Sequence, residues 1–111
     1  MKNKLIHLDC TLRDGGYYNN WFFDRKLINE YLHSMKKLQI DYVEIGFRFV
    51  DKKKVKGPTA YTTESFLNSL KIPKNLKLGV MINAGDFLNK KQISTLLINK
   101  FFTEKKKSKI S

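Results

Sequence analysis

The chain has 111 residues, of which 41% are hydrophobic and 13% aromatic, so it can bury a core and does not have the composition of a disordered protein. Its formal net charge is +12, but the basic residues are almost all lysine and are spread along the chain, which indicates a solvated surface rather than a nucleic-acid site. Cys10 is the only cysteine, which excludes an intrachain disulfide and fits a reducing cytoplasm. No apolar stretch approaches the ~20 residues of a membrane span. We therefore expect a soluble, cytoplasmic protein with no membrane contact.

The first expected elements are a strand and an amphipathic helix. Leu5 to Leu8 is a short apolar run that predicts a strand, and the polar segment "DCTLRDGG" at 9–16 follows it. Asp24 can accept a backbone N–H bond and so begin a helix. Apolar residues then recur at helical spacing, namely Leu27, Ile28, Tyr31, Leu32, Met35 and Leu38.

Two more strands are expected, each followed by a helix. "DYVEIGF" at 41–47 is almost continuously apolar, which is typical of a parallel strand covered on both faces. After a lysine-rich loop, "TTESFLNSLKIP" at 62–73 predicts a short helix capped by Thr62 or Thr63. "LKLGVMI" at 76–82 predicts a third strand that ends in "NAGD". A last helix is expected to begin near Asn89, with Gln92 completing a capping box.

This β-α-β-α-β-α order predicts an α/β protein with a parallel sheet and right-handed crossovers. In such sheets and in barrels, sites form at the carboxyl ends of the strands. Three polar segments fall there, in chain order "RDGG" at 13–16, "GFR" at 46–48 and "NAGD" at 83–86. The sequence therefore predicts a site at this end of the sheet.

The chemistry of the first polar segment is specific. Asp14 offers a hard carboxylate oxygen, which Mg²⁺ and Mn²⁺ favour as a ligand. Arg13 offers a fixed positive fork that could stabilise an oxyanion or an enolate. Gly15 and Gly16 would allow a sharp turn and a close approach of the backbone to a ligand. The structural alternative is an Arg–Asp surface pair in a tight turn.

"DCTLRDGG" resembles the D-x-T-L-R-D-G signature of the DRE-TIM metallolyases, a superfamily of metal-dependent aldolases and acyl-CoA lyases. "IDYVEIGFR" at 40–48 and "LGVMINAGD" at 78–86 resemble its second and third strands. The resemblance implies a (β/α)₈ TIM barrel, of which this chain would hold the N-terminal three β/α units. Residues 1–111 would then form a partial aldolase-type domain.

The resemblance also implies roles for four residues. Arg13 corresponds to the arginine that stabilises the enolate, and Asp14 to a ligand of the divalent cation, Mn²⁺ or Mg²⁺, that holds a 2-oxo acid substrate. Glu44 falls on a glutamate that faces the substrate, although an ion pair with a neighbouring lysine is an equal alternative. Asp9 matches the signature and is expected to support the metal site from behind.

Two departures from the family stand in the sequence. Where the hydroxy-oxovalerate aldolases have a proton-transferring histidine, this chain has Tyr17, for which both proton transfer and a packing or lid role are open. The family completes its metal site with an H-x-H pair on a later strand. This chain has only His7 and His33, which do not form such a pair.

Three hypotheses follow, because a complete barrel takes about 250 residues and at least about 200. The first is a truncated aldolase-like protein that is inactive alone and leaves its third strand as an open edge. The second is one half of a split aldolase completed by another chain, with a complementary chain or a further copy of itself as partner. The third is a small basic module that binds nucleic acid or an acidic partner; it ranks last because the lysines do not alternate with aromatic residues.

Overall fold

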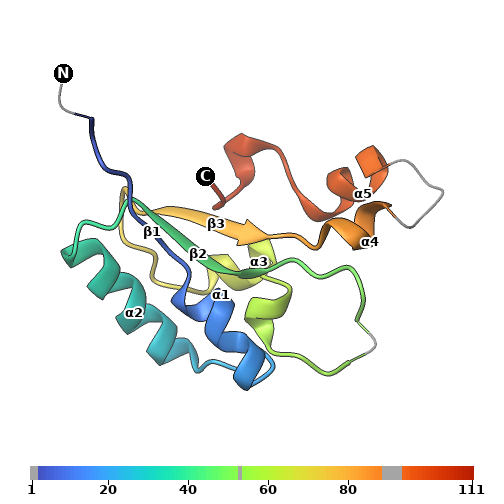
Figure 1. Ribbon diagram of the computed structural model, residues 1–111, viewed down its shortest axis with the longest axis horizontal. Coiled ribbons are helices and arrows are strands. Elements are labelled where there is room, and N and C mark those ends of the chain that lie inside the picture. The colour runs from blue at the N-terminus through green and yellow to red at the C-terminus, as the bar shows by residue number, and fades with distance from the viewer. Residues whose placement is uncertain (1–2, 53, 89–93) are drawn as a thin grey trace.

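The computed structural model describes residues 3–52, 54–88 and 94–111. In these ranges three strands form one parallel sheet in the order β1-β2-β3 (Figure 1). The strands are β1 (Leu8–Asp9), β2 (Tyr42–Phe47) and β3 (Lys77–Met81). This confirms the predicted α/β class and the parallel pairing. The first strand is shorter than expected: it begins three residues later, at Leu8, and ends one residue later, at Asp9, so that His7 precedes it.

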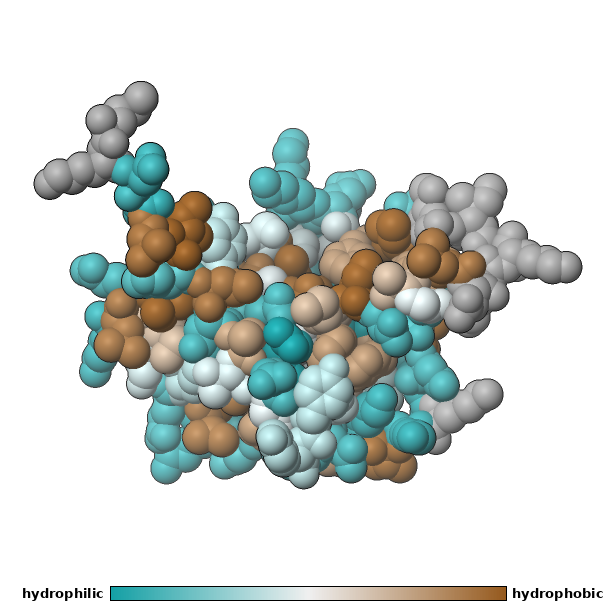
Figure 2. All heavy atoms as spheres, viewed as in Figure 1, coloured by the Kyte–Doolittle hydropathy of each residue, from teal (hydrophilic) through white to brown (hydrophobic). Residues whose placement is uncertain are grey.

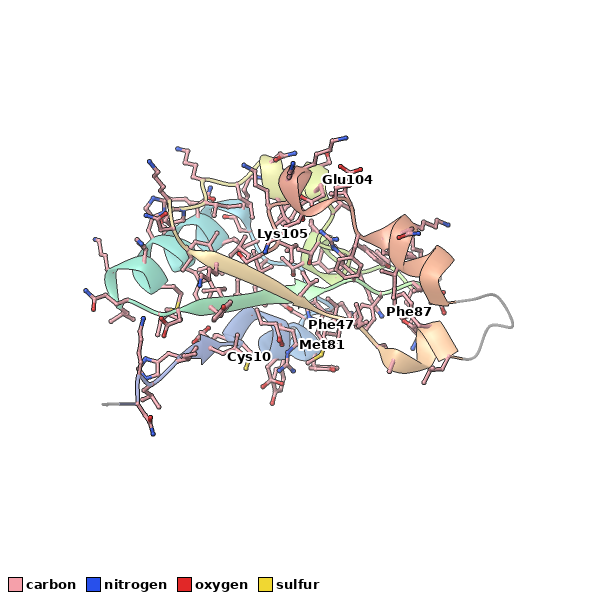
Figure 3. All side chains as sticks on the ribbon, turned by 90° about the horizontal axis from the view of Figure 1, so that it is seen from above. Cys10, Phe47, Met81, Phe87, Glu104 and Lys105 are labelled. Carbon is pink, nitrogen blue, oxygen red and sulfur yellow. The ribbon has the colours of Figure 1, made fainter. Side chains whose placement is uncertain are left out.

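Five α-helices and three short 3₁₀ turns connect and follow these strands in the described residues. They are α1 (Thr11–Gly15), η1 (Gly16–Tyr18), α2 (Arg25–Lys37), η2 (Pro58–Ala60), α3 (Glu64–Asn68), α4 (Ala84–Leu88), α5 (Ser94–Phe101) and η3 (Lys105–Lys107). Helices α2 and α3 lie on one face of the sheet (Figure 3). None of the helices in the described ranges is long and apolar enough to cross a membrane.

Helix α2 begins as the sequence predicts, since the side chain of Asp24 accepts from the backbone N–H of Lys26 at 3.4 Å. Its buried face is narrower than the predicted stripe. Ile28 and Leu32 are fully buried, whereas Leu27 and Leu38 are 49% and 66% exposed. Tyr31 and Met35 are partly buried against the core, so of the predicted stripe only Leu27 and Leu38 are mostly in solvent.

The main core lies between the sheet and helices α1, α2 and α3. Its buried members are Leu12, Ile28, Leu32, Val43, Ile45, Leu67, Leu70, Leu76 and Leu78. A second, aromatic cluster lies at the carboxyl ends of the strands and consists of buried Trp21, Phe47 and Ala60, with Phe23, Phe49, Tyr61 and Met81 against them. Figure 3 shows Phe47 and Met81, which are partners in the β2–β3 register, together at this end.

The predictions for the elements after β2 are confirmed for α3 only in part of their detail and differ from the structure after β3. Thr63 caps α3 by accepting from the backbone N–H of Phe66 at 3.1 Å, as one of the two predicted caps. Residues 84–86 of the "NAGD" segment begin α4, a helix that the sequence did not predict. The predicted helix start at Asn89 and the capping role of Gln92 lie outside the described residues.

Strand β3 is an edge of the sheet, as predicted, but the C-terminal residues cover part of that edge. Ser111 donates its backbone N–H to the carbonyl of Leu78 at 2.9 Å, and its hydroxyl accepts from the N–H of Leu78 at 3.2 Å. Ile110 packs against the main core. Residues 108–111 therefore lie beside β3 and satisfy backbone groups that would otherwise face water.

Candidate functional site

The site is built around an ion pair between helix α1 and strand β2. Helix α1 begins two residues after β1 and carries Arg13, whose Nε–H donates to Oε1 of Glu44 on β2 at 2.6 Å. The two side chains are only 20% and 15% exposed, so water screens the pair weakly. The hydrogen bond that Arg13 donates to Glu44 raises the pKa of Arg13, which keeps the guanidinium charged. The partner of Glu44 is thus Arg13 and not a neighbouring lysine.

Asp14 lies beside this pair and faces solvent. Its side chain is 70% exposed, and its Oδ1 lies 3.6 Å from Nη1 of Arg13. The contact with Arg13 leaves Asp14 as an accessible carboxylate next to a fixed positive charge. The structure thus brings Arg13, Asp14 and Glu44 together near the carboxyl ends of β1 and β2.

Asp9 supports the start of α1. Its carboxylate accepts from the backbone N–H of Thr11 at 3.0 Å, from the hydroxyl of Thr11 at 3.1 Å and from the hydroxyl of Tyr31 on α2. Burial raises the pKa of Asp9, but the hydrogen bonds from Tyr31 and Thr11 outweigh it and leave the pKa below its usual value. Burial and the nearby carboxylate raise the pKa of Tyr31. Asp9 therefore holds α1, and with it Arg13, in place.

Gly15 and Gly16 act differently from the prediction. Gly15 and Gly16 both have right-handed helical backbone, with φ of −61°, so neither provides a turn that needs glycine. Instead, a Cβ at Gly16 would lie 1.9 Å from the Trp21 ring, whereas one at Gly15 would meet nothing closer than 3.8 Å. Gly16 is required by the packing of Trp21.

Trp21 was not predicted as part of the site. It is 3% exposed, and its Nε1–H donates to the backbone oxygen of Arg13 at 2.9 Å. Its backbone has φ of 61°, which is unusual for a bulky residue and shows that packing holds it there. Nothing in the sequence pattern indicated this contact, because it depends on where the chain returns after η1.

Tyr17 lies on the same aromatic cluster. It is 61% exposed and packs edge-on against Trp21 and Phe47, with ring centroids 4.9 and 6.0 Å apart. Its ring is therefore half-covered and lies over the end of β2, a position compatible with either role that the sequence left open.

The polar segments "GFR" and "NAGD", which were predicted at the same end of the sheet, do not bring their charged side chains to Arg13. Arg48 of "GFR" is 2% exposed and donates to the backbone oxygens of Thr62 at 2.9 Å and Phe101 at 2.6 Å. Its Nη2 also donates to Glu64 at 3.1 Å. Asp86 of "NAGD" accepts from the N–H of Val50 at 3.4 Å. These residues therefore link loops.

The residues present do not make a complete metal centre. In the part of the chain that the structure describes, no three His, Cys, Asp or Glu side chains lie close enough to hold one ion. Asp14 offers one accessible carboxylate, and Glu44 is paired with Arg13. His7 precedes β1 and His33 lies on the exposed surface of α2. The two histidines therefore come from different elements and do not form a ligand pair with Asp14. A divalent cation would need further oxygen or nitrogen ligands.

Comparisons with known proteins give one similar solved structure. No family model matches the chain, and no curated protein is similar to it. A solved structure, the N-terminal domain of a putative aldolase from Bacteroides vulgatus, matches with a TM-score of 0.68 and 43% identity over 74% of this chain. The match covers 27% of that protein's chain, so this chain spans about a quarter of its length. The chain is therefore similar, in sequence and in structure, to the N-terminal portion of an aldolase-type protein.

Proposed function

We propose that this chain carries the arginine–carboxylate half of the active site of a metal-dependent aldolase or lyase that breaks or forms a carbon–carbon bond in a 2-oxo acid. The observation that carries the proposal is Arg13, fixed by Glu44 at 2.6 Å beside the exposed carboxylate of Asp14. The likeness to the N-terminal domain of a putative aldolase supports it, at 43% identity. In the proposed enzyme the three strands are the first three of a (β/α)₈ barrel.

The proposed roles follow from the geometry. Glu44 holds Nε of Arg13, which fixes the plane of the guanidinium and leaves its other N–H groups for a substrate oxygen. When a carbon–carbon bond next to the keto group breaks, negative charge develops on the keto oxygen, and a preorganised guanidinium stabilises it. Asp14 would supply one ligand of the Mn²⁺ or Mg²⁺ ion that polarises the same oxygen.

Tyr17 is proposed to cover the substrate rather than to move its proton. Its exposed ring packs edge-on against Trp21 and Phe47, and Trp21 in turn contacts the backbone of Arg13. From there it could exclude water from a bound 2-oxo acid. Because only one metal ligand is present, we propose that this chain alone is inactive.

Completion by a second polypeptide is the alternative that the surface favours. Figure 2 shows hydrophobic surface at the N-terminal end of β1, where Leu5, Ile6 and Leu8 are 74%, 65% and 57% exposed. Within the described residues β1 pairs only with β2, so its other edge is available for another strand. A complementary chain would cover this edge and bring the missing ligands.

A test uses oxalate, a planar dianion that resembles the enolate of pyruvate, together with Mn²⁺ and the ¹⁵N-labelled chain. We expect Mn²⁺ to broaden amide signals around Asp14, and oxalate to shift the side-chain signal of Arg13. Asp14→Asn should abolish the broadening, while the control Asp51→Asn should not. Arg13→Lys should abolish the oxalate shift, while Arg25→Lys should keep it. Unchanged responses in Asp14→Asn and Arg13→Lys would contradict the proposal.

The third hypothesis, a basic binding module, depends on a different surface. A groove of about 750 Å³ along α2 is lined by Arg25, Lys26, Lys37 and Lys71 together with Glu30 and His33. Salt-sensitive binding of RNA or DNA without divalent metal would favour it. Metal-dependent pyruvate release by a mixture with a second chain would favour the split enzyme instead.

A further inference from the structure

A cavity of about 700 Å³ lies beside the carboxyl end of β2, and it is separate from the Arg13 site. Its walls come from the segment after β2, from the start of α3 and from the end of α5. The residues that carry its charge and its ring surface are Arg48, Lys52, Tyr61, Glu64, Lys100 and Phe101. This volume is within the range of sites that enclose small molecules. Arg13, Asp14 and Glu44 do not line it.

Arg48 fixes a positive charge in the wall of the cavity. The side chain is 2% exposed, and the backbone oxygens of Thr62 and Phe101 hold its guanidinium in one orientation. Its ring neighbour is Phe102, whose centroid lies 4.8 Å from the guanidinium carbon. These contacts hold the guanidinium in one place, so its charge has a fixed position behind the cavity wall, where it is paired with Glu64.

Glu64 does not balance the charge of the whole cavity. Its carboxylate binds Arg48 and also accepts from the hydroxyl of Ser108 and from the backbone N–H of Lys109 at 2.9 Å. Lys52 and Lys100 have no carboxylate partner among residues 3–52, 54–88 and 94–111; their ammonium groups lie over the rings of Tyr61 at 5.6 Å and Phe101 at 5.9 Å. Three cationic side chains therefore face one carboxylate, and two positive charges remain.

Besides its positive charge, the cavity presents aromatic surface, which a ligand would also have to match. Tyr61 and Phe101 present ring surface to the cavity, and the hydroxyl of Tyr61 is held by the backbone oxygen of Lys54 at 3.3 Å. A ligand that carries only charge would leave these rings in contact with water. A ligand with an anionic group and a flat apolar part would satisfy both features.

We propose that this cavity binds a small organic phosphate, with its phosphate near Arg48, Lys52 and Lys100 and its planar ring against Tyr61 and Phe101. A phosphate monoester is close to a dianion at neutral pH and matches the two remaining positive charges. A single carboxylate would neutralise only one of them. The site is independent of the proposed aldolase chemistry, because it shares no residue with it.

The test measures binding to the full chain by calorimetry, with adenosine monophosphate as probe and with adenosine and inorganic phosphate as its two parts. We expect saturable binding of adenosine monophosphate and weaker binding of each part. The double variant Lys52→Gln/Lys100→Gln should weaken it by about tenfold or more. Both lysines are exposed, so the fold should persist. A control double variant, Lys74→Gln/Lys105→Gln, removes the same charge from exposed positions that do not line the cavity.

Three results would overturn the proposal. The first is the absence of saturable binding by adenosine monophosphate. The second is an equal loss in both double variants, which would mean that only the overall charge of the chain attracts the probe. The third is binding of inorganic phosphate as tight as that of adenosine monophosphate, which would exclude a role for the rings. Loss of Asp14 or Arg13 should not change the result, so this test is distinguishable from that of the proposed function.

Discussion

Trp21 donates its indole N–H to the backbone oxygen of Arg13 at 2.9 Å, and so connects the aromatic cluster to the residue that carries the proposed chemistry. The same ring lies directly on Gly16, three residues after Arg13. Gly16, the buried tryptophan and the arginine therefore form one structural unit. Disturbing the ring should displace the arginine.

Gly16→Ala should destabilise the fold by about 1–3 kcal/mol, because its new methyl group would lie 1.9 Å from the Trp21 ring and force the ring to move. Gly15→Ala is the matched control, with 3.8 Å of space and helical backbone, and should be neutral or stabilising by up to about 1 kcal/mol. Urea unfolding followed by tryptophan fluorescence measures both. Equal stability of the two variants would show that Trp21 does not need the glycine.

Glu44→Gln should loosen Arg13 without unfolding the chain, because the amide keeps the shape of the side chain but loses the charge. The Nε–H of Arg13 donates to Glu44 at 2.6 Å, and its exchange with water should become at least about tenfold faster in the variant, as expected for the loss of a charge-assisted bond. The measurement is exchange of the guanidinium Nε–H with water, followed by NMR. Glu30→Gln, on the exposed side of α2, is the control and should leave this rate unchanged.

Tyr31→Phe should reduce stability by about 1 kcal/mol near neutral pH, since it removes a hydrogen bond to the charged, partly exposed Asp9. The pKa of Asp9 is lowered in the folded chain, so its contribution is present above the ordinary value of 3.8 and is lost as the pH falls through the folded pKa. The pKa of Tyr31 is raised, so its contribution is present below its ordinary value of 10.0 and is lost at higher pH.

The variant should therefore show a smaller loss of stability in acid and above pH 10 than the parent chain. Thermal unfolding across this pH range measures the difference. Tyr18→Phe serves as control because Tyr18 is 94% exposed, and it should reproduce the parent curve. A parent-like curve for Tyr31→Phe would show that the Asp9 contact does not contribute.

Glu64→Gln should release residues 108–111 from the edge of β3. Burial raises the pKa of Glu64, but the bonds from Lys109, Ser108 and Arg48 outweigh it and leave the pKa below 4.5. The stabilisation is thus present above pH 4.5 and is lost as the pH falls through the folded pKa. In the variant the amide of Ser111 should exchange about tenfold faster or more at neutral pH, because Arg48 loses its charged partner.

The control for this change is Glu104→Gln. Glu104 is 76% exposed and pairs with Lys107 at 3.9 Å, a surface contact worth about 0.5 kcal/mol or less. Hydrogen exchange of the Ser111 amide should not respond to it. A parent-like exchange rate in Glu64→Gln would mean that Glu64 does not hold this segment.

The sequence by itself determined the order of the three strands and of helices α2 and α3, but not α1 or α4. Periodic apolar residues and capping side chains are local signals, so α2 with its Asp24 cap, α3 and the parallel strands β2 and β3 follow directly from it. The sequence left Thr62 and Thr63 open as the cap of α3, and the structure selects Thr63. The signature segment likewise pointed to Arg13 and Asp14 after the first strand, and the structure places both on α1, which begins two residues after β1.

Only the tertiary structure decided which of these residues meet. The Arg13–Glu44 pair joins positions 31 residues apart, and the Trp21 contact depends on a backbone with φ of 61° that no propensity predicts. Arg48 belonged to the predicted site by its place after β2, yet its side chain lies among Thr62, Glu64 and Phe101. Its place after a strand fixes the position of the backbone of a residue such as Arg48. The direction of a buried charged side chain depends on the surrounding packing, because burial is costly unless the charge is paired and hydrogen-bonded.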